Sequence, residues 1–463
     1  MTRKFKGMVM IAVLMLVVLA LSACSNNAGN DGQTFAEARS NFSTVLTEQR
    51  NTNAPIPIPP PGVFDLVYFE SEVGELAAFV SCDPGDGQLH PLIIWVVGGW
   101  GHGISDVPWS YPEWANDQTG SAFREAGILM MYPSFRGSHG NPAYFETMFG
   151  DIDDILAAYE FAAALPFVDP NRIYLGGHST GGTRVLLASA LTDRFRAVFS
   201  FGPVYDIGNH NRTQFTFNLN NREERRMRSP VHWLGDIASP TFVIEGAAGN
   251  ATDIRNLERA SNNENVHTFL VAGGDHFDVL APITKLLAQK ILEDTGATVN
   301  IQLTDAEIQR AMNNVPDQSS MPIMAPHHNP WAGVGFLLPF VWDVDFFEET
   351  GTFIYESVFH EDNSWEASYL ALEVFGIDGP ISAQAFEEAW GLDPAIFARN
   401  QTQVDGQTVY FWEGINDWDM YFEKTAIFQY DDTLVVFSFA VPEEFSESAV
   451  PIFRKIMYSV TFE

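Results

Sequence analysis

The sequence predicts an α/β protein, in which a doubly wound, mostly parallel sheet is followed by a smaller α+β domain. Short apolar runs alternate with segments of helical spacing over residues 63–296, which is the pattern of a parallel sheet. Several runs are apolar throughout, as expected of strands that are covered on both faces. This alternation stops near Thr295-Gly296, and runs of period-two character follow. The predicted strands are residues 92–97, 127–132, 171–176, 197–201, 241–245 and 268–271.

The remaining elements of the first domain follow from local signals. Residues 64–80 contain two apolar runs around Gly74 and predict two strands joined by a turn. A helix opens at Asp151, because apolar residues follow at helical spacing and carboxylates lie in the first turn. A second helix is predicted up to Leu191, and residues 280–292 form a closing helix. We therefore place the first domain at residues 63–296.

Residues 297–463 predict an α+β domain of unknown role. Helices are expected over 303–312, 383–390 and 443–457, with a kink or break at Pro451 in the last one. The predicted strands are 368–375, 408–412, 421–429, 433–440 and a short strand within 458–462. A Pro- and His-rich loop occupies 321–330. Its adjacent histidines, His327 and His328, lack the spaced partners of a metal site, so we expect no bound metal.

The first stretch is a targeting signal. Arg3, Lys4 and Lys6 precede an apolar run from Met8 to Leu21, which is too short for a spanning helix and is typical of a signal peptide. The run ends in Leu21-Ser-Ala-Cys24, which resembles the bacterial lipobox. The resemblance implies a lipoprotein signal peptide over residues 1–23 and lipidation of Cys24. Acyl chains there would anchor the protein in the bacterial envelope, on the periplasmic face or the cell surface.

Ser25 follows this cysteine in place of aspartate, so the choice between inner and outer membrane stays open. Residues 24–62 are Asn-, Ala- and Pro-rich and end in a proline run, which favours an extended spacer between anchor and domain. The chain has 59 acidic against 25 basic residues, so nucleic acid is not expected as a partner. With Cys24 lipidated, Cys82 is left as an unpaired strand residue.

A Gly-x-Ser-x-Gly turn lies between a predicted strand and a predicted helix. Ser179 is its central residue, and Gly177 and Gly181 flank it. A serine at such a turn strains the backbone, so the flanking positions need residues without Cβ. The hydroxyl is then held above the sheet, where the positive end of the helix favours nearby negative charge. Ser179 is therefore the candidate nucleophile.

This pattern, with others around it, resembles the α/β-hydrolase fold, and within it the prolyl-oligopeptidase and dienelactone-hydrolase-like groups. The resemblance covers about half of the chain, in the family's order, and implies a serine hydrolase acting on esters or on amide bonds of short peptides. Such an enzyme needs no cofactor. The matching segments are residues 132–138, 169–173, 177–182, 229–230 with 239–241, and 273–276.

A serine hydroxyl needs a base to remove its proton. His276 lies in a Gly-Gly-Asp-His loop between the last strand and the last helix, where this fold places its histidine. The resemblance implies an acid shortly after the strand that ends at Glu245-Gly246, but Asn250 occupies the usual position of the aspartate. We predict Asp253 as the acid, with Glu245 and Asn250 as alternatives. Asn250 in this role would indicate a weak or degenerate site.

The oxyanion of the tetrahedral intermediate needs backbone N–H donors. We expect one from Thr180, directly after the nucleophile, and the other from Trp100 in the Gly98–Gly101 loop. The alternative for this loop is a tight strand-to-helix turn without a catalytic role.

Aromatic and basic residues surround the predicted site. Trp100, Trp109, Tyr111 and Trp114 could line a substrate pocket or pack their loop onto the protein body, and both interpretations stay open. Residues 209–228 are polar and interrupt the strand–helix alternation. A solvated insertion is favoured there over a lid that selects carboxylate ends, although it carries Arg222, Arg225, Arg226 and Arg228. Arg136 could meet a carboxylate or serve a structural turn.

These observations predict a serine hydrolase that cleaves ester or short-peptide amide bonds through Ser179, Asp253, His276 and an acyl-enzyme. Its partners would be a small ester or peptide substrate and, through the lipid anchor, a membrane. The alternative is a catalytically weak or inactive lipoprotein that kept the fold and serves as a binding module.

Overall fold

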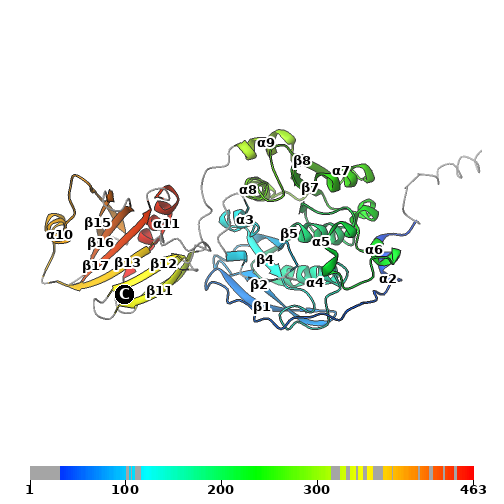
Figure 1. The fold of residues 1–463 in the computed structure, drawn as a ribbon, viewed down its shortest axis with the longest axis horizontal. Coiled ribbons are helices and arrows are strands. Elements are labelled where there is room, and N and C mark those ends of the chain that lie inside the picture. Colours follow the sequence, from blue (N-terminus) through cyan, green and yellow to red (C-terminus); the bar gives the residue numbers. More distant parts are fainter. Residues whose placement is uncertain are drawn as a thin grey trace, which may run out of the picture. The chain divides into compact units, whose positions relative to one another are not determined.

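A computed structural model describes most of the chain (Figure 1). By internal contacts it separates into an N-terminal unit, residues 1–43, and a main unit, residues 44–463. The predicted signal peptide and Cys24 lie outside the described residues. The described residues are 32–100, 104–105, 107–109, 116–313, 324–329, 334–339, 342–347, 352–357, 369–377, 379–404, 407–416, 421–430, 433–442 and 446–462.

The described part of the N-terminal unit contains one short helix, α2 (Phe35–Ser40). It begins in a capping box: the Thr34 hydroxyl accepts from Glu37 N at 3.2 Å, and the Glu37 carboxylate accepts from Thr34 N at 2.8 Å. Two N–H groups at the start of the helix are thereby satisfied.

The main unit begins with an eight-stranded sheet in the order β1-β2-β4-β3-β5-β6-β7-β8. The first two strands form an antiparallel hairpin, β2 pairs antiparallel with β4, and all later pairings are parallel. The predicted mostly parallel α/β sheet is therefore confirmed. The strands are β1 (Phe64–Ser71), β2 (Gly74–Ser81), β3 (His90–Val96), β4 (Leu129–Pro133), β5 (Val168–His178), β6 (Val198–Phe201), β7 (Thr241–Gly246) and β8 (Val266–Val271).

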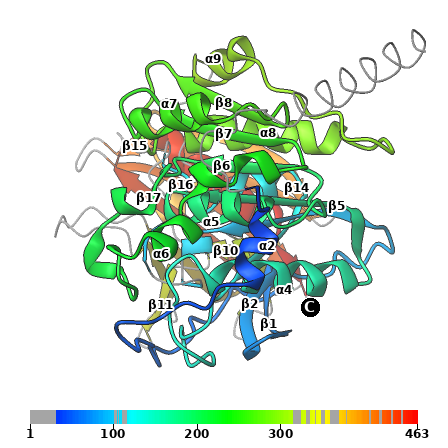
Figure 2. The same cartoon turned by 90° about the vertical axis from the view of Figure 1, so that its right-hand side faces the viewer.

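Helices cover both faces of this sheet, as Figures 1 and 2 show. Helices α4 and α5 pack together on one face, and α3 and α8 pack on the other, where α9 joins them. The α-helices are α3 (Ser121–Glu125), α4 (Gly150–Ala164), α5 (Thr180–Ser189), α6 (Arg222–Met227), α7 (Ala251–Ala260), α8 (Leu280–Glu293) and α9 (Asp305–Asn313). Short 3-10 helices are η1 (Val107–Trp109), η2 (Ile207–Asn209), η3 (Arg212–Gln214), η4 (Pro230–His232) and η5 (Leu234–Asp236).

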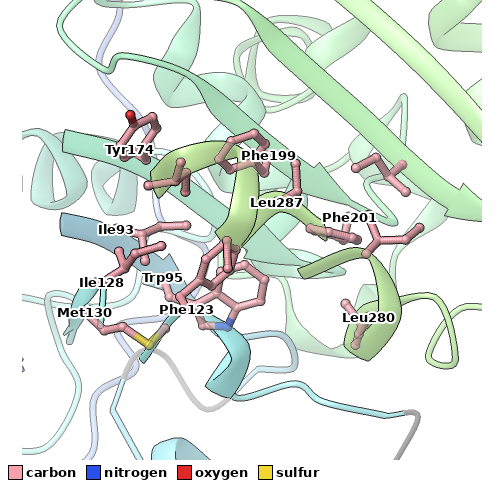
Figure 3. Packing of buried hydrophobic residues seen from close by; sticks show 14 of the residues in the cluster. Ile93, Trp95, Phe123, Ile128, Met130, Tyr174, Phe199, Phe201, Leu280 and Leu287 are labelled. Atoms are coloured by element: carbon pink, nitrogen blue, oxygen red, sulfur yellow. The ribbon is translucent and has the colours of Figure 1, made fainter. Parts of the chain in front are cut away.

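The main core lies between the sheet and the α3/α8 layer (Figure 3). Ile93 and Trp95 of β3 point into it together with Phe199 of β6 and Leu287 of α8, and all four are fully buried. Burial of side chains this large is the dominant favourable term in folding. Ile301, Leu303 and Ile308 belong to the same core, so this core extends beyond the predicted boundary at residue 296.

The end of the predicted spacer is attached to the sheet region. Thr47 N donates to the Thr216 carbonyl at 2.7 Å, and Thr52 exchanges two backbone hydrogen bonds of 2.8 Å with Gly137 and Gly140. Ile56 packs against the main core. Residues 47–56 therefore run along the body instead of forming a free tether, because their backbone groups find partners there.

The C-terminal region contains two antiparallel sheets. One has seven strands in the order β11-β12-β13-β17-β16-β15-β14, and the other has three in the order β18-β10-β9. The predicted strands within 368–375, 408–412, 421–429 and 433–440 are present, whereas β9 to β12 and β14 were not predicted. The strands are β9 (Met324–Asn329), β10 (Val334–Pro339), β11 (Trp342–Phe347), β12 (Thr352–Ser357), β13 (Tyr369–Gly376), β14 (Ala398–Val404), β15 (Gln407–Asn416), β16 (Tyr421–Tyr430), β17 (Thr433–Pro442) and β18 (Thr461–Phe462).

Two helices accompany these sheets, α10 (Ala383–Trp390) and α11 (Ser446–Tyr458). Phe453 of α11 packs into a core with Phe437 and Phe439 of β17, while Phe386 of α10 stacks on Trp412 at 5.0 Å in a second cluster. Helix α11 continues through Pro451, so the expected break does not occur. Among all the described helices, none combines the length and apolar character needed to cross a membrane.

Candidate active site

The predicted site residues gather at the carboxyl ends of the parallel strands. Ser179 follows β5, the Gly98–Trp100 loop follows β3, Glu245 lies near the end of β7, and His276 follows β8. The chain leaves β3 toward β4 on one side of the sheet and returns to β5 on the other. Such a reversal of strand order opens a crevice, which is where open α/β sheets place their ligands.

Ser179 occupies a strained turn between β5 and α5. Its φ of 57° and ψ of −114° lie in a region that residues other than glycine rarely adopt. The turn is held by the Ser179 N–H, which donates to the Phe201 carbonyl of β6 at 2.8 Å. A Cβ at Gly181 would lie 2.0 Å from the Val96 carbonyl oxygen, and one at Gly177 would lie 2.9 Å from the Gly181 backbone. The flanking glycines are therefore required by close backbone packing, as predicted.

His276 pairs with Glu245. The His276 Nδ1 lies 2.8 Å from Glu245 Oε2, and Glu245 is fully buried while the imidazole is 19 % exposed. The other carboxylate oxygen accepts from Gly246 N at 2.8 Å. An ionised carboxylate can only accept, so Nδ1 carries the proton and Nε2 keeps a lone pair. This arrangement is the one a general base needs.

Gly202, directly after β6, brings this pair next to the nucleophile. A Cβ at this position would lie 2.5 Å from His276 Cε1 and 2.8 Å from Glu245 Oε2. The preceding residue, Phe201, holds the Ser179 N–H. The imidazole and the serine turn therefore pack around the same short backbone segment. No hydrogen bond joins the Ser179 hydroxyl to the imidazole in the described part of the chain. This does not exclude His276 as the base, because catalytic hydrogen bonds often tighten only when substrate binds.

Asp253, the predicted acid, does not contact His276. Its Oδ1 accepts from Tyr205 N and from Asn209 Nδ2, each at 2.9 Å. Asp253 lies in the first turn of α7, a helix absent from our prediction, where a carboxylate favours the positive helix end. Asn250, the other alternative, donates to the Gly202 carbonyl at 3.2 Å. The structure thus assigns the partner of His276 to Glu245, one of the two alternatives to Asp253.

Two sequence signals could have indicated this pairing. Ile254 and Leu257 are spaced as on one face of a helix, which would have placed Asp253 in a helical turn. Glu245 ends an apolar strand, and a carboxylate buried in such a run requires a charged or hydrogen-bonding partner.

His178 is a further residue of the site that we did not predict. Its Nε2 lies 3.0 Å from the His276 carbonyl, and the two rings are 4.6 Å apart at their centroids. Burial, with the nearby His276 as a smaller cause, lowers the pKa of His178 to about 3. The ring is therefore neutral at physiological pH, and its Nε2–H donates to a carbonyl that can only accept. His178 secures the loop that carries the candidate base.

The predicted oxyanion loop is also connected to helix α5. The Thr180 hydroxyl donates to the Gly99 carbonyl at 2.5 Å, and Gly99 has a φ of 79° that favours glycine. Thr180 opens α5, where first-turn N–H groups have no partner within the helix. Trp100 is half-buried and makes edge contacts with the rings of His210 at 5.4 Å and Phe215 at 6.1 Å.

The other aromatic residues of this segment divide between packing and undescribed positions. Trp109 is buried against Phe79 at 4.9 Å and Phe64 at 6.3 Å, so it packs the segment onto the core. Tyr111 and Trp114 lie outside the described residues. Of the two described members of the predicted cluster, Trp100 is the one that lies on the loop beside Ser179.

The arginines considered for carboxylate recognition differ in their contacts. Arg228 is fully buried and pairs with Glu224 at 2.5 Å, while Arg225 pairs with Asp206 at 2.7 Å. Arg136 is bound by Asp154 at 2.8 Å, which supports its structural interpretation. Arg226 lies over the Trp233 ring at 4.3 Å, and Arg222 is exposed. Within the described residues, no group of three or more His, Cys, Asp or Glu side chains is placed to hold a metal ion.

The strand order and the strained serine turn together define the class of fold: the sheet region has the α/β-hydrolase fold. More particularly, residues 114–276 match the model of the prolyl oligopeptidase family. This match includes Ser179, Glu245 and His276.

Individual relatives are similar over shorter stretches. The quorum-quenching protein AidA of Acinetobacter baumannii is 35% identical over 81 residues, which are 18% of this chain and 27% of the relative. The polyketide transferase claH of Penicillium crustosum is 38% identical over 78 residues, or 17% and 25%. The alignments thus span only about a quarter of these curated relatives. Among solved structures, a puromycin-hydrolyzing peptidase of Mycobacterium tuberculosis matches 52% of this chain and 40% of its own at 19% identity, with a TM-score of 0.42.

Proposed function

We propose that the chain is a serine hydrolase that cleaves ester or short-peptide amide bonds through Ser179, His276 and Glu245. The observation that carries this proposal is the hydrogen bond between His276 and the buried Glu245 carboxylate beside the strained Ser179 turn. A buried acid that fixes the imidazole tautomer is what activation of a serine hydroxyl requires.

In the proposed reaction, the Ser179 oxygen attacks the substrate carbonyl while its proton passes to His276 Nε2. Glu245 stabilises the imidazolium that forms, and the N–H groups of Thr180 and Trp100 bind the oxyanion. The imidazolium then protonates the leaving alcohol or amine, which departs and leaves an acyl group on Ser179. Water, deprotonated by the same imidazole, hydrolyses this acyl-enzyme and regenerates the free serine.

The alternative, an inactive binding module, drew its support from the missing aspartate near residue 250. Glu245 supplies a carboxylate to His276 from a different position of the same strand–loop segment. The departure from the family pattern therefore gives no reason to expect a dead site.

A fluorophosphonate probe tests this proposal directly. The folded chain should react with one probe molecule, and peptide mass spectrometry should map the adduct to Ser179, because only an activated hydroxyl reacts at neutral pH. Heat-unfolded protein is the control and should remain unlabelled. A folded chain that does not react, or one labelled at another serine, would contradict the proposal. Turnover of p-nitrophenyl esters and of peptide p-nitroanilides by the same protein then separates ester from amide specificity.

We also propose that the chain is a bacterial envelope lipoprotein, cleaved before Cys24 and anchored through it. The support is the lipobox-like sequence from Leu21 to Cys24 behind a basic, apolar leader. Cells that express the full chain and receive an alkyne-tagged fatty acid should yield a labelled protein in the membrane fraction. The C24S variant should lose the label and leave that fraction. Equal labelling of both proteins would rule out this anchor.

A further inference from the structure

A series of buried hydrogen bonds connects the ion pair between Asp151 of α4 and Arg184 of α5 to the predicted oxyanion loop. Asp151 of α4 accepts from Arg184 Nε at 2.8 Å, and Arg184 Nη1 donates to the Thr180 hydroxyl at 3.2 Å. The same hydroxyl donates to the Gly99 carbonyl. These hydrogen bonds are all donated in the same direction, from the guanidinium to the hydroxyl and from the hydroxyl to the carbonyl, so that each polarises the next.

The two charges of this ion pair are almost fully buried. Arg184 and Asp151 are each 1 % exposed, and the guanidinium lies over the Phe135 ring at 5.1 Å. Removing two charges from water is costly, and apolar residues of similar volume would often stabilise such a position equally well. Contact between α4 and α5 alone therefore does not require an arginine here. The hydrogen bond to Thr180 gives the guanidinium a use beyond packing.

That use follows from the geometry of the peptide bond. The Gly99 carbonyl and the Trp100 N–H belong to one planar, trans peptide and point in opposite directions. Fixing the carbonyl on the Thr180 hydroxyl therefore fixes the direction of the Trp100 N–H. Gly99 itself cannot impose this orientation, because glycine rotates freely about φ and ψ. Thr180 thus contributes twice to the predicted oxyanion hole. Its N–H is one donor, and its hydroxyl orients the peptide that carries the other donor, the Trp100 N–H.

We propose that the Thr180 hydroxyl and Arg184 are positioning residues that orient the Gly99–Trp100 peptide for oxyanion binding. The inference rests on the proposed function and adds two side chains to it. An oxyanion donor acts mainly in the transition state, so a misdirected Trp100 N–H should lower kcat while KM stays near its wild-type value.

The first test compares T180V with T180S in the full chain. Valine keeps the shape of threonine without the hydroxyl, and we expect kcat to fall about 100-fold, as for small misplacements of catalytic groups. Serine keeps the hydroxyl and should recover most of the lost rate. S189A, on the same helix, removes a buried hydroxyl that donates only to the Leu186 carbonyl, and it should leave kcat unchanged.

A transition-state analogue separates positioning from a structural role. The inhibition constant of a boronic acid that forms a tetrahedral adduct with Ser179 should rise in T180V by the same factor as kcat falls, whereas that of the substrate-derived product acid should not. The double variant D151N/R184M removes the ion pair and its hydrogen bond to Thr180 without leaving a buried unpaired charge. It should lower kcat and weaken boronate binding together. Thermal unfolding of each variant shows that it is folded.

The outcomes are distinct. T180V with wild-type kcat and boronate affinity would overturn the inference. Equal losses in T180V and T180S, accompanied by a weaker KM and a lower unfolding temperature, would also overturn it and indicate a packing role. A wild-type chain that neither reacts with fluorophosphonate nor turns over any ester or peptide would overturn the proposed function, and the inference with it.

Discussion

Replacing Ser179 with alanine is expected to lower kcat by about a million-fold, to the residual rate that binding and the oxyanion hole supply. Without the hydroxyl no acyl-enzyme can form, and His276 has no proton to accept. The turn should survive, because its backbone hydrogen bond from residue 179 to Phe201 does not involve the side chain. Steady-state hydrolysis of the best ester substrate, together with thermal unfolding, measures both effects.

S200A provides the matched control for this experiment. Ser200 is fully buried in the neighbouring strand β6, and its hydroxyl donates to the Gly182 carbonyl at 2.8 Å. Its removal should change stability more than catalysis. If S179A retained more than a small fraction of the wild-type rate, another nucleophile would have to carry the reaction.

Replacing Glu245 with glutamine is expected to lower kcat by about ten-thousand-fold, because a neutral amide no longer selects the His276 tautomer that can accept a proton. The amide is nearly isosteric with the carboxylate, so the packing around Gly202 and Gly249 should be kept. The measurement is kcat for hydrolysis at neutral pH, at saturating substrate.

D253N tests the competing assignment under the same conditions. Asp253 binds Tyr205 N and Asn209, so its replacement should act on the loop after β6 and on the start of α7, with kcat close to wild type. A large loss in D253N beside a small one in E245Q would return the role of the acid to Asp253.

Much of the fold could be predicted because its signals are local. The parallel sheet appears in the sequence as apolar runs, and the Ser179 turn appears as glycines that close backbone contacts require. The loop of His276 could be placed for the same reason, since it directly follows a recognisable strand. The expected function class rested on these elements together with the resemblance to the α/β-hydrolase family.

The partner of His276 could not be fixed in this way, because pairing of side chains depends on how β7 and the loop after β8 meet in space. Glu245 looks like the end of a strand, and Asp253 looks like a loop residue until α7 is recognised. Strand β14 was missed for a different reason. It is an edge strand whose residues 398–403 are mostly polar and exposed, which suits an edge that must not recruit further strands but hides the apolar alternation.

The position of Glu245 has a consequence for how sequences of this kind are interpreted. A search that requires an aspartate on the loop after β7 would classify this chain, and others with the same arrangement, as inactive. The structure indicates a different pair of positions. Residue 202 is glycine, because any side chain there would collide with the imidazole, and residue 245, one residue before the end of β7, is glutamate. On the proposed function, sequences that carry this pair of positions are candidate hydrolases that an aspartate-based search would miss.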